Sequence, residues 1–495
     1  MVNPNYEVKF VNSIWEKETA LPRYESLKQD LTVDVAVIGG GMAGILTAYL
    51  LQKQGVNVVV LEAKTIGSGQ TGKTTAKITS QHNLIYHKLV SSLGIEQAKL
   101  YADANQEAIG MYRNLAKRCT DAVVFEEKEN VLYAVQNPDA IEKEVKAMQQ
   151  LDLKAKLVTQ TELPFPIAAA VSLDGQAQFQ PLAFLKEISS DLTIFEHTMV
   201  QNIEDRIVKT NQGNITAKHI VIATHYPFIN IPGYYFLRQH QERSYVLALK
   251  DAQQYRGMYL GIDEPSYSFR NAGEYLLFGG ASHRTGENRC GGHYNTLRKA
   301  AHQFYPNAQE VAYWSAQDCM TIDHIPYIGP YAFGMEGVYV ATGFQKWGMT
   351  SSMVSAMILS DLILEKENPY LSVFTPHRMP IGLSAKQAVK DTVHSVRGLA
   401  AGFMAPPRAM VEQLPKGHGG IVEVENKKVG VYKDENGTSH IVQARCTHLG
   451  CQLEWNPDEK SWECPCHGSR FDYMGHVIDN PTMEDLKYDS ITEYE

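Results

Sequence analysis

The sequence is poor in cysteine and in long apolar runs. Seven cysteines in 495 residues are an odd and sparse set, which excludes a secreted scaffold built on disulfides. The longest apolar windows, such as Ser351 to Leu364, fall short of the about 18 residues that a membrane-spanning helix needs, so no transmembrane segment is predicted. The N-terminus has no basic stretch followed by an apolar one, so we expect no secretory signal and a cytoplasmic protein.

The chain also lacks an excess of positive charge. Its 46 Lys and Arg stand against 55 Asp and Glu, a net charge of −9, which excludes a protein that coats nucleic acid. Apolar residues make up 44% and charged residues 20%, an ordinary globular composition. Nearly all of the net charge lies between Gly419 and Glu495, where 15 Asp and Glu stand against 7 Lys and Arg. This uneven distribution indicates two different modules in one chain.

A βαβ pattern opens the first module. Val33 to Ile38 is a short apolar run typical of a buried strand, and the helical spacing of apolar residues from Ile45 to Gln54 follows a glycine-rich turn. A second apolar strand, Val56 to Leu61, ends at Glu62. The unit spans about 30 residues, which is the context that a dinucleotide fingerprint requires.

The turn itself matches G-x-G-x-x-G. The first glycine permits the tight turn, the second lets the backbone approach a pyrophosphate, and the third lets helix and strand pack closely. The helix N-terminus offers backbone N–H groups to the anion, and the carboxylate 18 residues after the third glycine is placed to bind a ribose hydroxyl. A carboxylate there repels a 2′-phosphate, which disfavours NADP. The predicted dinucleotide contacts are Gly39, Gly41, Met42, Ala43, Gly44 and Glu62.

Three further blocks distinguish FAD from NAD. They are Ile66 to Gly72, Ile220 to Pro227 and Ala341 to Thr350. Together with the glycine turn they resemble the glycine oxidase and D-amino-acid oxidase superfamily of FAD enzymes, over about residues 30 to 375. The resemblance implies FAD contacts at Ser68, Gly69, Thr71, Gly72, Ala223, Thr224, Gly343, Gln345, Lys346, Gly348, Met349 and Thr350.

In the superfamily, the last of these blocks, Ala341 to Thr350 in this sequence, forms a turn that lies against the flavin ring. A helix N-terminus or Lys346 would stabilise the negative charge of the reduced ring. An ordinary strand-turn-helix with a surface lysine is the alternative. His225 stands where the superfamily has a glycine.

The candidate catalytic residues are His82, Lys346 and Asp318. Asp318 and Cys319 occupy the place of an Arg-Pro pair whose arginine holds a substrate carboxylate in amino-acid oxidases. An acid cannot hold a carboxylate, so Asp318 favours an amine substrate or is a structural acceptor. His82 follows the flavin loop, where it is a candidate acid or base or a structural donor.

The C-terminal module carries C-x-H, then fifteen residues, then C-x-x-H. Two thiolates and two neutral imidazoles suit the two irons of a Rieske [2Fe–2S] centre. Zinc is the alternative for such a set, but it leaves Cys451 and Cys466 without a role. The candidate metal ligands are Cys446, His448, Cys464 and His467.

This module resembles the Rieske domain of cytochrome bc-type complexes over about residues 410 to 495. The resemblance implies the four ligands and a disulfide between Cys451 and Cys466. It also implies that Ser469 donates to a bridging sulfide, while Phe471 replaces a tyrosine donor and predicts a lower potential than in those proteins. We do not expect a Rieske oxygenase, because the 28 residues given after His467 are too few for a domain with a mononuclear iron.

These patterns predict an α/β FAD-binding Rossmann-like domain with an interleaved α+β substrate domain, plus a small all-β Rieske domain at the C-terminus. The FAD-dependent oxidoreductase is expected in residues 1–376, a linker in 377–409 and the Rieske [2Fe-2S] domain in 410–495.

A flavin takes two electrons at once, whereas the cluster carries one. The expected function is therefore oxidation of an amine or amino-acid-like substrate at a C–N bond, as a dehydrogenase more than an oxidase. Electrons would pass through the cluster to an external one-electron acceptor, either a protein or a quinone. A redox-sensing protein, and a reductase whose electrons enter through the Rieske centre, stay open as alternatives.

Overall fold

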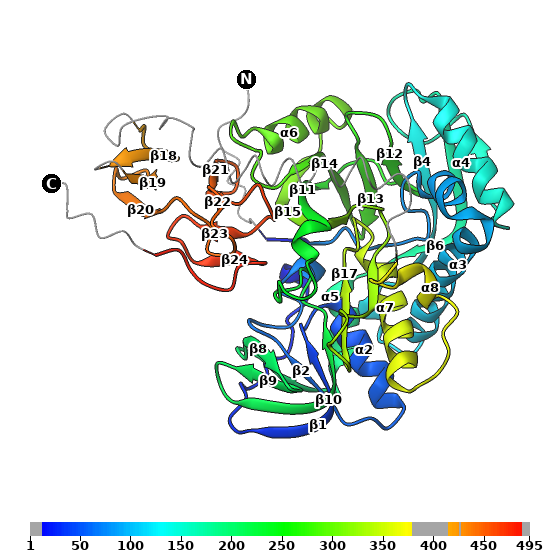
Figure 1. Cartoon of the computed structure of the whole chain (residues 1–495). Helices are drawn as coiled ribbons and strands as arrows, with labels where there is room; N and C mark the ends of the chain where they lie inside the picture. The colour runs from blue at the N-terminus through cyan, green and yellow to red at the C-terminus, as the bar shows by residue number, and fades with distance from the viewer. Residues whose placement is uncertain (1–11, 379–413, 425–426, 488–495) are drawn as a thin grey trace. The chain divides into compact units, whose positions relative to one another are not determined.

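The computed structural model describes residues 12–378, 414–424 and 427–487 (Figure 1). The chain divides into two compact units, each assembled from three segments. The first unit contains Met1–His225, Ser244–Ala281 and Tyr294–Leu383, and the second contains Tyr226–Arg243, Ser282–His293 and Ser384–Glu495. The predicted linker, 377–409, lies outside the described residues from 379 onward.

The first unit contains an eight-stranded sheet whose centre is parallel. Its order is β16 (Tyr327–Pro330), β17 (Val338–Thr342), β10 (Asn214–Ile222), β1 (Leu31–Ile38), β2 (Val58–Leu61) and β7 (Thr193–Phe195), and the hairpin β8 (Val200–Glu204) and β9 (Ile207–Thr210) pairs with β10. Strand β2 reads Val-Val-Val-Leu and is buried throughout, as expected for a parallel strand covered on both faces.

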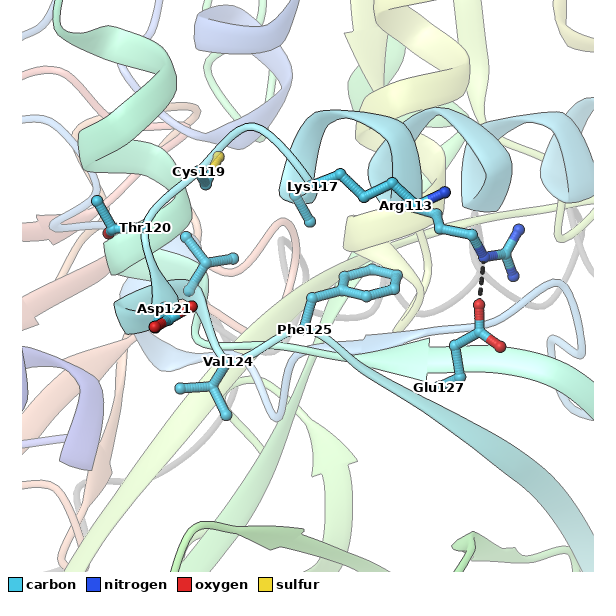
Figure 2. Close-up of a pocket in the computed structure, with 10 residues that line it drawn as sticks. Arg113, Lys117, Cys119, Thr120, Asp121, Val124, Phe125 and Glu127 are labelled. Carbon is cyan, nitrogen blue, oxygen red and sulfur yellow. Dashed lines mark hydrogen bonds and ion pairs between the residues drawn. The ribbon is translucent and has the colours of Figure 1, made fainter.

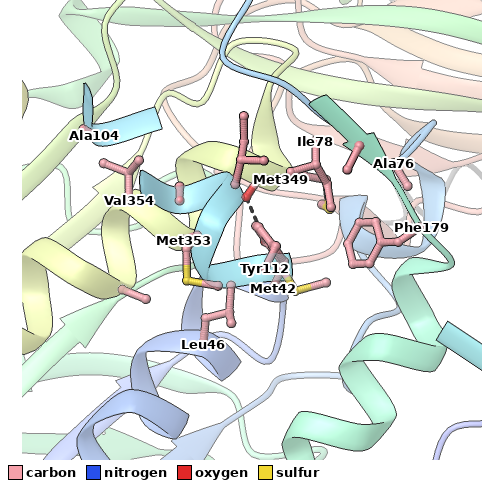
Figure 3. Packing of buried hydrophobic residues seen from close by; sticks show 14 of the residues in the cluster. Met42, Leu46, Ala76, Ile78, Ala104, Tyr112, Phe179, Met349, Met353 and Val354 are labelled. Atoms are coloured by element: carbon pink, nitrogen blue, oxygen red, sulfur yellow. Dashed lines mark hydrogen bonds between the residues drawn. The ribbon is translucent and has the colours of Figure 1, made fainter. Parts of the chain in front are cut away.

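Two nearly apolar helices pack together in the core of this unit. They are α2 (Met42–Lys53) and α7 (Gly348–Ile363). Figure 3 shows Met42 at the start of α2 and Met349 at the start of α7 on either side of Tyr112, whose hydroxyl donates to the Met349 carbonyl at 2.8 Å. The two helix N-termini are thereby held in one buried cluster.

The other helices are shorter or amphipathic, except for one long helix that is kinked at Gly94. They are α1 (Ile14–Glu18), the kinked α3 (Ile85–Ala116), α4 (Pro138–Gln150), α5 (Pro181–Ser189), α6 (His293–Phe304) and α8 (Leu371–Phe374), with 3-10 turns η1 (Gln70–Lys73), η2 (Asp121–Val123) and η3 (Tyr235–Leu237). Among the described residues, none of the helices combines the length and the apolar character that a membrane crossing requires.

A mixed nine-stranded sheet forms the other half of the first unit. Its order is β15 (Gln309–Thr321), β11 (Gln239–Lys250), β14 (Tyr275–Arg284), β13 (Ser268–Ala272), β12 (Met258–Gly261), β4 (Glu126–Ala134), β6 (Ala169–Gln178) and β3 (Lys77–Ile78), and β5 (Lys156–Val158) pairs with β6. The chain passes between the two sheets several times, so the two halves are interleaved.

The second unit contains two small antiparallel sheets. One consists of β18 (His418–Val424), β19 (Lys427–Lys433) and β20 (Ser439–Gln443), and the other of β21 (Glu454–Asn456), β22 (Ser461–Glu463), β23 (Arg470–Asp472) and β24 (Val477–Asp479). Trp455 of β21 joins the two sheets, because its ring stacks on that of Tyr432 of β19 at 4.9 Å between centroids. Two segments from earlier in the chain, at the start of β11 and the end of β14, complete this unit.

Candidate functional site

The predicted dinucleotide residues lie at the carboxyl ends of parallel strands. Ile38 at the end of β1 pairs with Ile222 at the end of β10 and with Leu61 at the end of β2. The glycine turn follows β1, Glu62 follows β2, and Ala223 and Thr224 follow β10. In an open α/β sheet this edge is where ligands bind.

The glycine turn is as close-packed as the fingerprint requires. Gly39 adopts a φ of +113°, and its N–H donates to the Leu61 carbonyl at 2.8 Å. A Cβ on Gly44 would lie 2.0 Å from the Gly39 carbonyl oxygen, so a side chain there displaces backbone. The third glycine of the fingerprint is therefore needed for helix α2 to begin at this point.

The N-terminus of α2 is open to an anion. Its N-cap residue, Gly41, makes no side-chain capping bond, and the Thr71 hydroxyl accepts the Met42 N–H at 2.9 Å. In a helix the next two N–H groups, of Ala43 and Gly44, also lack partners within the helix. Together with the helix dipole they suit a pyrophosphate.

Glu62 is held in place by two backbone donors. Its Oε2 accepts from the Gly40 N–H at 2.7 Å and its Oε1 from the Lys64 N–H at 2.8 Å. Burial raises the pKa of this carboxyl, and the two hydrogen bonds oppose the shift. Each carboxylate oxygen keeps a lone pair with which to accept a ribose hydroxyl.

A second open helix N-terminus follows β17. Helix α7 begins at Gly348 after Trp347, which provides no side-chain cap. In the preceding turn the Gln345 N–H donates to the Cys319 carbonyl at 2.9 Å, and the Gln345 Nε2 donates to the Thr321 hydroxyl at 2.7 Å. The Gln345 Oε1 is buried and has no hydrogen-bond partner among the described residues.

This unsatisfied acceptor fits a flavin. The pyrimidine edge of the ring offers one N–H donor and two carbonyl acceptors, which match the Gln345 oxygen and the free N–H groups of α7. The predicted contacts Gly343, Gln345 and Lys346 lie in this turn, and Gly348, Met349 and Thr350 form the first turn of the helix. Ser68 and Gly69 precede η1, which contains Thr71 and Gly72.

His82 is buried and both of its ring nitrogens are engaged. Nδ1 lies 2.7 Å from the Tyr101 hydroxyl, while Nε2 lies 2.7 Å from the Thr79 carbonyl and 2.9 Å from the Thr350 hydroxyl. The ring stacks on Trp347 at 5.1 Å. Burial lowers the pKa of His82 to about 3, so the imidazole is neutral near pH 7. It connects the loop after β3 to the start of α7.

The other two candidate catalytic residues differ in exposure. Lys346 is exposed, and Asp318 is half-buried on β15. Because Gln345 bonds to the backbone of Cys319, Asp318 is one residue from a direct contact with the predicted flavin turn.

A cavity of about 400 Å³ lies elsewhere in the first unit, at the end of α3 (Figure 2). Its wall includes Lys117, Cys119 and Phe125, and Arg113 pairs there with Glu127 at 2.5 Å. None of its lining residues is a predicted site residue.

The predicted cluster ligands lie in two loops with the same backbone pattern. In the first, the Cys446 N–H donates to the Cys451 carbonyl, and the Gly450 N–H donates back to Cys446. In the second, the Cys464 N–H donates to the Ser469 carbonyl, and the Gly468 N–H donates back to the Cys464 carbonyl. The two loops therefore share a backbone fold, and each contains one cysteine and one histidine, two positions apart in the first loop and three apart in the second.

The four side chains are buried or half-buried, and the two histidines carry the protonation that metal binding needs. The ring centroids of His448 and His467 are 5.0 Å apart at 90°, and neither Nδ1 has a hydrogen-bond partner among the described residues. Burial lowers the pKa of His448 to about 4 and of His467 to about 3, so both rings are neutral. A hydrogen bond from Cys464 lowers the pKa of the Cys446 thiol to about 7.

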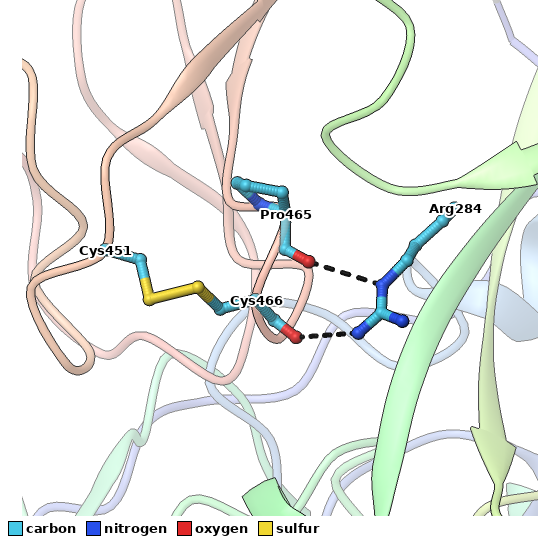
Figure 4. Close-up of a disulfide and its surroundings, with 4 residues drawn as sticks. All are labelled: Arg284, Cys451, Pro465 and Cys466. Atoms are coloured by element: carbon cyan, nitrogen blue, oxygen red, sulfur yellow. Dashed lines mark hydrogen bonds between the residues drawn. A yellow bond between two sulfur atoms is a disulfide. The ribbon is translucent and has the colours of Figure 1, made fainter. Parts of the chain in front are cut away.

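The structure contains the disulfide Cys451–Cys466 that the resemblance implies (Figure 4). The Sγ atoms of Cys451, Cys464 and Cys466 lie within 4.8 Å of one another. Because two of these sulfurs are bonded to each other, Cys446 and Cys464 are the thiols left for iron.

Sequence reasoning missed the residues that surround the cluster loops. Asn230, Phe236, Gln241 and Arg284 contact the loops, although they precede them by some 180 residues or more. No motif marks these positions in the sequence.

Comparison with known proteins agrees with this geometry. Residues 34–362 match the FAD dependent oxidoreductase family, and residues 406–492 match the Rieske [2Fe-2S] domain. The chain is 37% identical to the Rieske 2Fe-2S iron-sulfur protein YhfW of Bacillus subtilis (strain 168), over 98% of this chain and 99% of that protein. The predicted fold class and the two cofactors, FAD and a [2Fe-2S] cluster, are confirmed.

Two partial similarities concern the first unit. The chain is 25% identical to the gamma-glutamylputrescine oxidoreductase of Escherichia coli (strain K12), over 40% of this chain and 50% of that one. It shares the fold of glycine oxidase from Geobacillus kaustophilus, with a TM-score of 0.61 and 20% identity over 71% of this chain and all of that one.

Proposed function

The chain belongs to the FAD dependent oxidoreductase family and carries a Rieske [2Fe-2S] domain, and from this premise we propose that it oxidises a small amine or amino-acid-like substrate at a C–N bond. The electrons would leave one at a time through the cluster to an external protein or quinone. The observation that carries the proposal is the presence in one chain of two sites of complementary electron capacity. One is the flavin site with its Gln345 oxygen, and the other is the pair of imidazoles of His448 and His467; within the described part of the chain, neither the oxygen nor either Nδ1 has a hydrogen-bond partner.

FAD would be held by backbone and short side chains. The open N-terminus of α2 would bind the pyrophosphate, Glu62 the ribose, and the turn from Gly343 to Trp347 the ring. When bound, FAD accepts a hydride equivalent from the substrate. The N-terminus of α7 places partial positive charge where the ring becomes negative.

The cluster would be held by Cys446 and Cys464 on one iron and by the Nδ1 atoms of His448 and His467 on the other. Neutral imidazoles are the form that such ligands require. The hydrogen bond between the two thiols lowers the pKa of Cys446 and, together with burial, raises the pKa of Cys464, so Cys446 is the thiol that loses its proton first. When bound, the cluster transfers single electrons. Ser469 adds a hydrogen bond to the Cys446 sulfur.

Asp318 is our candidate for recognition of the substrate amine. It replaces the arginine that binds a carboxylate in amino-acid oxidases and lies beside the backbone contact between β15 and the flavin turn. A half-buried carboxylate there attracts a protonated amine and repels a carboxylate. We expect Asp318→Asn to raise KM for an amine substrate more than it lowers kcat.

His82 is proposed as a positioning residue. A general acid or base needs a free nitrogen toward the substrate, whereas both nitrogens of His82 contact Tyr101, Thr79 and Thr350. Its role would be to fix the start of α7 relative to the flavin loop.

The test is a screen of amines and amino acids under argon. A substrate should bleach the flavin absorbance, and the cluster should then be reduced. If no compound bleaches the flavin while binding to another protein changes on reduction, the chain is a redox sensor. If the protein produces stoichiometric peroxide in air even after cluster loss, it is an oxidase and the Rieske exit is not its electron route.

The ligand assignment has its own test. His448→Ala should abolish the electron paramagnetic resonance signal of the reduced cluster while leaving the flavin absorbance. His476→Ala is the matched control, because His476 is an exposed histidine of the same unit paired with Asp472 at 3.0 Å. An unchanged signal in His448→Ala would reject the assignment.

A further inference from the structure

We propose that the segment Tyr226–Arg243, which precedes the Rieske domain by more than 160 residues, positions both histidine ligands of the cluster, with Asn230 as its principal side chain. This role presupposes the ligand assignment proposed above. It makes a loop of the flavoprotein chain part of the immediate surroundings of the cluster.

The outer edges of both imidazoles face this segment. The Asn230 Oδ1 lies 2.8 Å from the His448 Nε2. The ring of His467 donates to the backbone carbonyl of Phe236, whose own ring lies edge-on at 5.9 Å. With each Nδ1 assigned to iron, each Nε2 carries the proton, so Asn230 and Phe236 act as acceptors.

The segment is fixed to the cluster loops by buried hydrogen bonds. Gln241 is buried, and its Nε2 donates to the carbonyls of His467 at 2.8 Å and Asn480 at 2.9 Å. The Asn480 side chain in turn donates to the Tyr226 carbonyl at 2.8 Å. The segment that carries the two acceptors, Asn230 and Phe236, is therefore fixed to the cluster loops near both of its ends, at Tyr226 and Gln241.

A second segment, Ser282–His293, contacts the same loop at Pro465 and Cys466. Figure 4 shows the Arg284 guanidinium directed at the carbonyls of Pro465 and Cys466, with distances of 3.3 and 3.4 Å. A Cβ on Gly286 would lie 2.6 Å from the Pro465 backbone nitrogen, and the Gly286 N–H donates to Glu463 at 3.1 Å. This approach leaves no room for a side chain or a bridging water at Gly286.

The arrangement has an electronic consequence. An acceptor on Nε2–H increases the electron density of the ring and makes it a stronger donor to iron, which stabilises the oxidised cluster. Asn230 therefore lowers the reduction potential of the cluster. It also prevents an external partner from reaching the Nε2 of His448.

The test is a redox titration of the full-length holoprotein at one fixed pH, followed by the electron paramagnetic resonance of the cluster. Asn230→Leu keeps the approximate side-chain volume but removes the acceptor, and we expect a higher midpoint potential than in the wild type. Asn230→Asp supplies a charged and stronger acceptor, and we expect a lower potential. A merely structural role would not move the two variants in opposite directions.

Asn288→Ala is the matched control. Asn288 is a buried asparagine of the Ser282–His293 segment, and its side chain is bonded to Asn456 and Asp458. We expect it to leave the potential unchanged. If Asn230→Leu loses the cluster, the direction of the Asn230→Asp shift decides alone.

Two failures can be told apart. If the cluster signal is present in both Asn230 variants and their midpoint potentials equal that of the wild type, the positioning role is wrong and the ligand assignment stands. If His448→Ala keeps the signal, the ligand assignment itself has failed.

Discussion

Replacing Arg243 with methionine removes one cation from a buried network in the second unit. The Arg243 side chain is 1% exposed and lies 2.9 Å from Glu459 and 3.8 Å from Glu463. Arg470 pairs with both of these acids and with Asp479 at 2.7 Å. Without Arg243, three buried or nearly buried carboxylates face a single cation.

We expect Arg243→Met to lower the free energy of unfolding of the second unit by a large amount, because the carboxylates that lose their partner are buried or nearly buried. Removing one partner of a buried pair costs about 3–5 kcal/mol. The control is Arg289→Met in the segment Ser282–His293. Arg289 is half exposed and pairs with Glu454 at 2.7 Å, so its replacement should lower the free energy of unfolding by less than about 1 kcal/mol.

The difference in unfolding free energy between Arg243→Met and the wild type should also depend on pH. Burial raises the pKa of Glu463, but the charges of Arg243 and Arg470 outweigh this and lower it below its ordinary value. A lowered pKa stabilises the folded state above the ordinary carboxyl range, and this contribution disappears as the pH falls through the folded pKa. The difference between Arg243→Met and the wild type is therefore largest near neutral pH and shrinks in acid.

Hydrogen exchange under native conditions measures this without reversible unfolding of the whole chain. Amides in β22 and β23, around the buried Trp462, should exchange roughly a hundredfold or more faster in Arg243→Met, since 1.4 kcal/mol is a factor of ten. If these amides exchange as slowly in Arg243→Met as in Arg289→Met, the view that the segment Tyr226–Arg243 and the Rieske sheets form one stable unit is refuted.

Three further outcomes follow. Ser469→Ala removes a hydrogen bond to a predicted thiolate ligand and should lower the cluster potential, by roughly 60 mV if the bond is worth tenfold; a redox titration showing no change would contradict it. Gly44→Ala should prevent FAD retention because its Cβ meets a backbone oxygen at 2.0 Å, whereas Gly110→Ala, in open space on α3, should retain FAD in the purified protein. The double variant Cys451→Ser and Cys466→Ser opens a loop of 15 positions and should destabilise the second unit by about 3 kcal/mol in the same exchange assay; equal rates would contradict it.

The sequence predicts well the parts of this fold that are encoded locally. The βαβ unit shows in the apolar runs on either side of the glycine turn, because strand and helix periods differ and only glycine tolerates the geometry at Gly39 and Gly44. The Cys-His loops are visible because four ligands to one cluster must recur at fixed spacing.

The sequence does not predict contacts between distant segments. Asn230 and His448 are 218 positions apart, and Arg243 and Glu459 are 216 apart. Nothing in the composition around an asparagine or an arginine tells which loop it will meet, since that depends on the folding of the sheets in between. The same holds for His82, whose place after the flavin loop is visible while its three hydrogen-bond partners are not.

The most direct test of electron transfer within one chain needs no known substrate. The flavin of the oxidised holoprotein is reduced by a light flash with a photochemical donor under argon, and the flavin and cluster absorbance bands are followed in time. We expect the cluster to be reduced as the flavin is reoxidised, with a rate constant that does not depend on protein concentration. A rate proportional to protein concentration, or a cluster that stays oxidised while the flavin stays reduced, would contradict the function proposed for this chain.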